Sequence, residues 1–169
     1  MNRLLPADIR IIEASEAAED FHPRHQALAK TYEYRIWRTE VCPPFCRRYV
    51  HHYPYPLDVD AMRAAAAAVE GEHDFSAFAA ADGSDALGRS KIRTIFNSRV
   101  EEDEERLIYS VRGSGFLKHM VRNMVGTLIE AGKGNVGPAD FARMLEPGYP
   151  AKAGPTAPAS GLFLVNVEY

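Results

Sequence analysis

The sequence predicts an α+β fold, a mostly antiparallel sheet with helices packed on one face. Residues 31–37 alternate apolar and polar side chains, as a half-buried strand does. Residues 93–111 contain two strand-like runs joined by a short acidic turn, which is typical of a hairpin. Residues 117–129 repeat apolar side chains at helical spacing. Because these elements interleave without an internal repeat, we expect residues 1–169 to form one domain.

Composition sets the class of protein. The 169 residues are 46% hydrophobic and 25% charged, which describes an ordinary globular domain with a sizeable core. No apolar run approaches the roughly 18 residues of a membrane span, and the start of the chain lacks a signal-peptide pattern. We therefore expect a cytoplasmic protein without a membrane partner. Lys plus Arg is 20 against 23 Asp plus Glu, so a nucleic-acid partner would need a local basic patch.

The first part of the chain contains two expected strands. Residues 4–11 indicate a turn that leads into a short alternating strand. Residues 31–37 alternate more clearly, with Tyr32, Tyr34 and Ile36 on one face. Tyrosines in such a pattern usually belong to a core, so we expect this face to be buried.

The segment between Arg24 and Arg48 is the locally basic part of the chain. Between these two arginines lie four further Lys or Arg residues and two acids. This excess favours a phosphate-binding face that includes Lys30, Arg35 and, from the later helix, Arg122, because phosphate contacts give affinity without reading sequence. The competing interpretation is a solvated surface with scattered charge.

Cys42 and Cys46 share a turn that contains two prolines, and His51 and His52 follow closely enough to raise a zinc site. Structural zinc sites usually show one close ligand pair and a second pair farther along the chain, whereas adjacent histidines on an extended segment point to opposite faces. We therefore expect reduced, partly buried thiols and no metal.

An alanine-rich helix is expected from Val59 to about Glu70, with Asp58 as its N-terminal cap and Gly71 as its stop. The segment 72–78 follows, and we expect its phenylalanines in the core and Asp74 as a local cap. A catalytic role for the adjacent His73 and Asp74 is not favoured, because no nucleophile motif lies beside them. Residues 79–90 indicate a loop of the kind that often moves when a partner binds.

The second half of the chain begins with the hairpin at residues 93–111. Its acidic tip at 101–105 is expected to be solvated and to lie away from any nucleic-acid partner. A short helix is expected at about residues 138–145. The chain then approaches its last, clearly alternating strand through a stiff extended segment that contains Pro155 and Pro158.

The helix at residues 117–129 is the clearest element, with Ser114 expected as its cap and Gly132 as its stop. At about 100° per residue, Arg122 falls on the border of the apolar stripe, one turn after Lys118. On helix geometry alone these two residues would be solvated flanking charges. A border arginine can also reach into a cleft.

Residues 116–126 read Phe-Leu-x-His-Met-Val-Arg-Asn-x-Val-Gly, and this run resembles the signature helix of the tRNA pseudouridine synthase A family. Further motifs occur in the family's order and extend the resemblance over residues 5–169. They are Leu5-Pro-x-Asp-Ile, Phe21-His-Pro-Arg24, Lys30-Thr-Tyr32-Glu-Tyr34, Gly71-Glu-x-Asp-Phe-x-x-Phe78 and Ala157-Pro-x-x-Gly161-Leu162.

The resemblance implies roles for individual residues. Arg122 pairs with the nucleophilic aspartate and keeps it ionised, and Tyr32 packs against the target uracil while Tyr34 is structural. Gly161 and Leu162 line the floor of the active site. The remaining substrate contacts implied are to RNA, from Arg24, Lys30 and Lys118.

The family's nucleophilic aspartate lies in an Arg-Thr-Asp-x-Gly-Val-His run, and no such run exists here. The resemblance therefore implies a pseudouridine synthase half-molecule, the C-terminal part of the catalytic region, inactive alone, with Arg122 facing a solvent-open pocket. It implies tRNA as the partner, with the anticodon stem-loop as the modified region, a homodimer for full-length members, and no metal or cofactor. The alternative function is a non-catalytic RNA-binding module or chaperone.

Overall fold

The computed structural model describes residues 1–81, 90–150 and 153–169. Of the loop expected at residues 79–90, residues 82–89 lie outside this description. Within the described ranges, no helix is long and apolar enough to cross a membrane.

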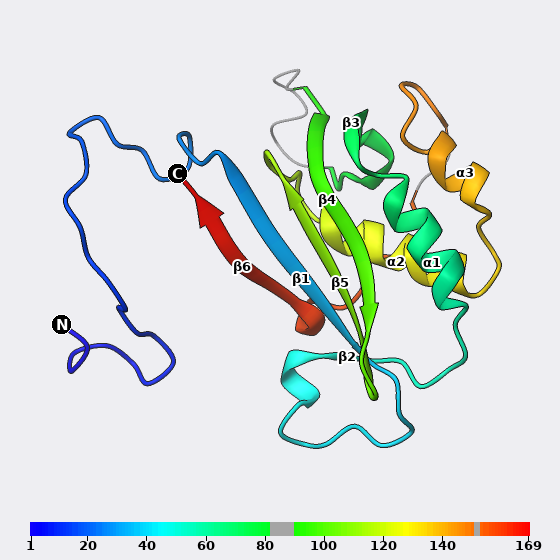
Figure 1. Cartoon of the computed structure of the whole chain (residues 1–169), viewed down its shortest axis with the longest axis horizontal. Coiled ribbons are helices and arrows are strands. Elements are labelled where there is room, and N and C mark those ends of the chain that lie inside the picture. Colours follow the sequence, from blue (N-terminus) through cyan, green and yellow to red (C-terminus); the bar gives the residue numbers. More distant parts are fainter. Residues whose placement is uncertain (82–89, 151–152) are drawn as a thin grey trace.

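The described part of the chain forms a six-stranded sheet in the order β2-β1-β5-β4-β3, with β6 also paired to β1 (Figure 1). All pairings are antiparallel except the short parallel one between β1 and β2, which confirms the expected sheet. The strands are β1 (Ala29–Trp37), β2 (His51–His52), β3 (Gly71–Asp74), β4 (Ile92–Glu102), β5 (Arg106–Gly113) and β6 (Leu162–Glu168).

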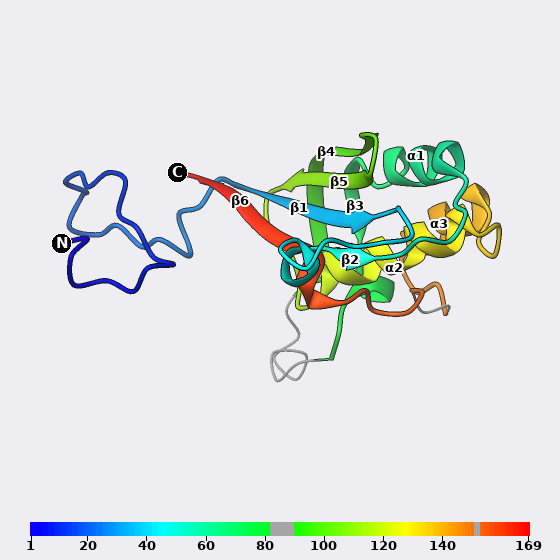
Figure 2. The same cartoon turned by 90° about the horizontal axis from the view of Figure 1, so that it is seen from below.

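The helices gather at one side of the sheet, as the two views in Figures 1 and 2 show. This arrangement confirms the predicted fold class. The α-helices are α1 (Val59–Ala67), α2 (Met120–Gly132) and α3 (Pro138–Arg143). Single 3-10 turns occur at η1 (Arg47–Tyr49), η2 (Ser76–Phe78) and η4 (Ala159–Gly161).

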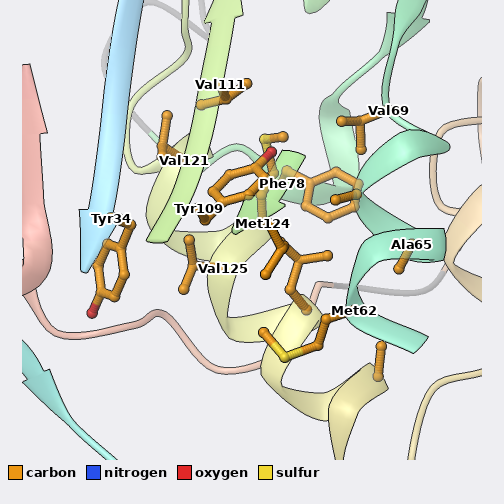
Figure 3. Close-up of a cluster of buried hydrophobic side chains, with 14 of the residues drawn as sticks. Tyr34, Met62, Ala65, Val69, Phe78, Tyr109, Val111, Val121, Met124 and Val125 are labelled. Carbon is orange, nitrogen blue, oxygen red and sulfur yellow. The ribbon is translucent and has the colours of Figure 1, made fainter. Parts of the chain in front are cut away.

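The core lies between the sheet and the helices (Figure 3). Strand β1 supplies it from one face, because side chains alternate along a strand: Tyr34 is 0% and Ile36 1% exposed. Glu33 and Arg35 alternate with these two residues along the strand. They therefore lie on the opposite face of the sheet, where they pair with each other. Tyr32 packs against the edge of the core.

Helix α1 begins as predicted, because the side chain of Asp58 accepts a hydrogen bond from the Ala61 amide at 2.9 Å. The helix ends at Ala67, earlier than expected. Gly71 opens β3 with φ of +104°, a left-handed conformation that favours glycine. The expected cap at Asp74 is also present, since its carboxylate accepts from the Ser76 amide at 2.8 Å.

The predicted start of the signature helix was wrong. Ser114 does not cap α2, because its hydroxyl accepts a hydrogen bond from the Thr94 amide and its own amide donates to the Thr94 carbonyl, which extends the β4–β5 hairpin. The helix begins at Met120, after His119, whose φ is 60°. A non-glycine residue in this conformation is uncommon. The helix ends at Gly132, as expected.

The strand expected within residues 4–11 was also wrong. Residues 1–28 contain no strand and extend away from the rest of the molecule (Figures 1 and 2). A strand needs a neighbour to satisfy its backbone, and within the described ranges none lies beside this one. Ile9 is accordingly 52% and Ile12 93% exposed. Near its end the segment joins the body through the Leu28 amide, which donates to the Glu168 carbonyl at 2.8 Å.

Residues 153–158, which we call the strap, lie across α2. Gly126 permits this contact, because a Cβ atom at that position would stand 1.7 Å from the Pro155 carbonyl oxygen. The strap is also hydrogen-bonded to the helix, from the Gly154 amide to the Thr127 hydroxyl at 2.9 Å and from the Ala157 amide to the Arg122 carbonyl at 3.1 Å. The strap therefore follows the surface of α2 closely.

Replacing Gly126 by Ala is expected to destabilise the protein by about 1–3 kcal/mol, because the added methyl group meets strap backbone that can yield only by moving away. Urea denaturation measures the change. Gly115→Ala is the matched control, since a Cβ atom there makes an ordinary contact of 3.8 Å with the Arg93 side chain. Equal unfolding midpoints for the two variants would contradict the tight contact.

Candidate active site

A pocket of about 360 Å³ lies beside the N-terminal end of α2. Its lining includes Tyr32 from β1, Lys118 and Arg122 from the signature segment, and Leu162 from the start of β6. These residues come from three parts of the chain that are far apart in sequence. The fold thus brings together four of the residues that the motifs singled out, and Arg122 lines a pocket as expected.

Arg122 is held by the strap. Its Nε atom donates a hydrogen bond of 2.6 Å to the carbonyl oxygen of Ala157. Within the described ranges, the two terminal nitrogens of its guanidinium meet no hydrogen-bond or ion-pair partner. A guanidinium anchored at Nε can still present both terminal nitrogens to an anion in the pocket.

Tyr32 is half-buried at the wall of the pocket. Its ring meets the ring of Phe116 edge to face, with centroids 5.1 Å apart and an angle of 82° between the planes. Burial raises the pKa of the Tyr32 phenol, so the side chain stays neutral at physiological pH. A neutral aromatic ring held at its edge by another ring is a suitable stacking surface for a base.

Tyr34 has a different role from Tyr32. It is fully buried, and its hydroxyl donates to the carbonyl oxygen of Pro158 at 2.7 Å. Burial raises the pKa of this phenol far above its ordinary value, and the nearby positive charge of Arg122 offsets only part of that rise. Tyr34 therefore joins the sheet to the end of the strap.

Gly161 and Leu162 lie where η4 passes into β6. Leu162 is partly buried and lines the pocket with its apolar side chain. Gly161 is buried and does not itself line the pocket. An added Cβ atom there would stand 2.8 Å from both the Arg35 carbonyl oxygen and the Tyr34 ring. The close approach that Gly161 permits is therefore to β1.

The predicted basic face is not one surface. Arg35 lies on the face of the sheet opposite to the helices, where it pairs with Glu33 at 3.0 Å and stacks over the Phe163 ring at 4.1 Å. The prediction grouped Arg35 with Arg122 because the two are basic. Alternation along β1 places Arg35 on the face away from the helices, whereas Arg122 belongs to helix α2. Lys30 lies near the beginning of β1, outside the lining of the pocket. Arg24 is exposed within residues 1–28.

Phe116 and His119 belong to the pocket, and the sequence analysis gave neither a role. Phe116 supports the ring of Tyr32, and His119 lines the pocket directly before α2. Both belong to the quoted signature run, so the motif contained the signal. Their roles could not be inferred from it, because helical periodicity does not show that the segment before Met120 is non-helical.

The cysteines stay apart from this pocket. Cys42 and Cys46 are both free and partly buried, and burial followed by the proximity of Cys46 raises the pKa of the Cys42 thiol. Burial lowers the pKa of His51, with a smaller contribution from His52. Among the residues that the structure describes, no group of three or more Cys, His, Asp or Glu side chains could hold a metal ion.

The comparisons with known proteins agree with the motifs. A family profile described as tRNA pseudouridine synthase matches residues 65–169. A protein named tRNA pseudouridine synthase A from Solibacter usitatus (strain Ellin6076) is 60% identical over 169 residues, which are 100% of this chain and 68% of that protein.

Proteins of the same name from Latilactobacillus sakei and Syntrophotalea carbinolica are each 43% identical over 100% of this chain, which spans 68% and 66% of their own lengths. The chain thus spans about two thirds of the length of these relatives. The profile match and these identities, together with the motifs gathered around Arg122, show that the chain belongs to the tRNA pseudouridine synthase family.

Proposed function

We propose that this chain supplies the arginine and tyrosine side of an active site that converts uridine to pseudouridine in tRNA. The meeting of Tyr32, Arg122 and Leu162 in one pocket carries the proposal. A flipped uracil requires an apolar edge and an aromatic wall, and a catalytic carboxylate requires a cation with terminal nitrogens to bind it. Within the described ranges, both terminal nitrogens of Arg122 are without a partner.

In the proposed reaction, an aspartate attacks the target nucleoside, the glycosidic bond breaks, and the detached uracil turns in the pocket. The uracil is then rejoined to the sugar through C5, which loses its proton, and the aspartate is released unchanged. We place this aspartate outside residues 1–169, because the Arg-Thr-Asp-x-Gly-Val-His run does not occur in them. The chain is then the C-terminal half of the synthase, and the missing half carries the nucleophile.

Each pocket residue has a proposed task. The terminal nitrogens of Arg122 bind the aspartate and keep it ionised and oriented, since an opposite charge within a few ångströms favours the charged form. Tyr32 stacks on the uracil and returns part of the few kcal/mol that leaving the RNA stack costs. Leu162 provides the apolar edge of the floor, and Gly161 lets that floor lie directly on β1.

The proposed substrate is the anticodon stem-loop of tRNA, modified in the cytoplasm by a homodimer. Lys118 lines the pocket, and Lys30 lies on β1, the strand that carries Tyr32. Both are therefore proposed as phosphate contacts near the target nucleotide. Arg24 is proposed to contact the RNA from the exposed segment 1–28. The acidic hairpin tip at residues 101–105 is solvent-exposed and is proposed to lie away from the RNA.

A non-catalytic RNA-binding module is the second candidate. It is favoured by one observation, that within the described ranges no carboxylate pairs with Arg122. The coding sequence upstream of Met1 separates the two functions. An Arg-Thr-Asp-x-Gly half-domain there supports the synthase, and its absence supports the binding module.

Arg122→Ala and Tyr32→Ala are each expected to abolish most isomerisation when this chain is combined with the missing half. For Arg122→Ala we expect a loss of at least about 100-fold, since breaking a buried charge pair costs about 3 kcal/mol or more. Arg122→Lys is expected to recover only part of the activity, because lysine keeps the charge and loses the planar fork.

Release of tritium from tRNA labelled at uracil C5 measures this reaction. Arg99→Ala is the control, since Arg99 is an exposed residue of β4 that pairs with Glu101 at 3.3 Å. Isomerisation by residues 1–169 alone would overturn the placement of the nucleophile.

Affinity for tRNA is expected to fall as salt rises. With about three phosphate contacts, raising salt from about 50 to about 200 mM lowers the binding constant by roughly 20- to 40-fold. Filter binding at several salt concentrations gives the slope, and alanine at Lys30 or Lys118 should reduce its magnitude by about one unit. Arg99→Ala should leave the slope unchanged. A binding constant that does not respond to salt would contradict the phosphate contacts.

A further inference from the structure

The strap holds Arg122 through the main chain of Ala157. The Ala157 carbonyl accepts from Nε of Arg122 at 2.6 Å, and the Ala157 amide donates to the Arg122 carbonyl at 3.1 Å. Both bonds use backbone atoms of Ala157, so its side chain does not orient the guanidinium. The position of Arg122 therefore depends on whatever fixes the strap at residue 157.

A second tie lies directly beside this one. Thr156 precedes Ala157 on the strap and Asn123 follows Arg122 on α2, and the Thr156 hydroxyl donates to the Asn123 side-chain oxygen at 2.6 Å. Asn123 is 8% exposed, and its amide nitrogen donates to the Phe78 carbonyl at 2.6 Å. That second bond fixes which end of the amide meets Thr156.

The other hydrogen bonds that the structure describes for the strap are at its two ends. At the first end, the Ala153 amide donates to the Ala77 carbonyl at 3.2 Å. The Gly154 amide donates to the Thr127 hydroxyl at 2.9 Å, and the Tyr34 hydroxyl donates to the Pro158 carbonyl at 2.7 Å. Between these ends, the hydrogen bond from Thr156 to Asn123 joins two side chains. Of the bonds between two side chains, it lies nearest to the Ala157 carbonyl. A change at Thr156 can therefore loosen the middle of the strap while both ends stay attached.

We propose that Asn123 and Thr156 are positioning residues, whose hydrogen bond holds the Ala157 carbonyl against Nε of Arg122 and so aims the terminal nitrogens of Arg122 into the pocket. They act through Arg122 and touch no substrate. The catalytic consequence rests on the function proposed above, whereas the geometric consequence does not. Thr156 is exposed, so its hydroxyl can be removed without opening the core.

The first experiment measures the aim of Arg122 directly. In the 169-residue chain labelled with ¹⁵N-arginine, NMR gives the exchange rate of the Arg122 Nε proton, which a short hydrogen bond slows. Thr156→Val, which keeps the shape of the side chain and removes the hydroxyl, is expected to speed exchange at least tenfold. Thr156→Ser restores the hydroxyl and is expected to restore slow exchange.

Ser98→Ala is the stability control, because it removes a buried hydrogen bond of 3.0 Å to the Tyr109 hydroxyl, away from the strap. It should lower the melting temperature and leave the exchange of the Arg122 proton unchanged. Unchanged exchange in Thr156→Val, or equal acceleration in Ser98→Ala, overturns the proposal. Fast exchange in Thr156→Ser overturns it as well.

The second experiment tests the catalytic consequence in the enzyme combined with its missing half. Thr156→Val is expected to lower kcat about tenfold with KM for tRNA unchanged, and Thr156→Ser is expected to restore kcat. An unchanged kcat, or a change confined to KM, overturns the positioning role. If the combined protein shows no isomerisation with any variant, the proposed function fails, and the exchange rates still decide whether the bond aims Arg122.

Discussion

The contact between the strap and α2 is the constraint on which the pocket depends. Because Gly126 has no side chain, the backbone of Pro155 can lie against the helix, and this closeness brings the Ala157 carbonyl within reach of Arg122. Farther along the strap, the Pro158 carbonyl accepts a hydrogen bond from the Tyr34 hydroxyl. The chain then continues to Leu162, which lines the pocket. A single tight backbone contact thus fixes the position of the cation and of the apolar floor together.

The sheet provides the second part of the arrangement. Strand β1 has the strap and helices on one face and a solvent-facing surface on the other, so adjacent residues along it serve different purposes. Tyr32 reaches the pocket, whereas Arg35 stacks on Phe163 on the far face. A charged residue an odd number of positions from a site residue on a strand is therefore a poor candidate for the same site.

Much of the fold could be predicted because it depends on local patterns. Alternation located β1 and the β4–β5 hairpin, helical spacing located α2, and Asp58 marked the start of α1. The errors arose where contacts with distant parts of the chain determine the local structure. Ser114 extends the hairpin because Thr94 lies opposite to it, and no local signal gives that register.

The site was predictable only in part, for the same reason. The motif named Arg122, Tyr32 and Leu162, and the pocket contains all three. The bond from Arg122 to Ala157 joins residues on a helix and a distant extended segment, which a pattern confined to one element cannot reveal. The tie between Asn123 and Thr156 is hidden likewise, because either residue alone resembles ordinary polar surface.

The assembly of the pocket from three distant segments has a consequence for folding. Contacts between residues far apart in sequence form late and slowly, because long loops must close before any of these contacts can form. The pocket therefore does not form in a partly folded chain. It forms together with the complete sheet. The fraction of molecules that carry a formed pocket then cannot exceed the fraction that are folded. A destabilising change in the core far from the strap therefore reduces the number of competent sites.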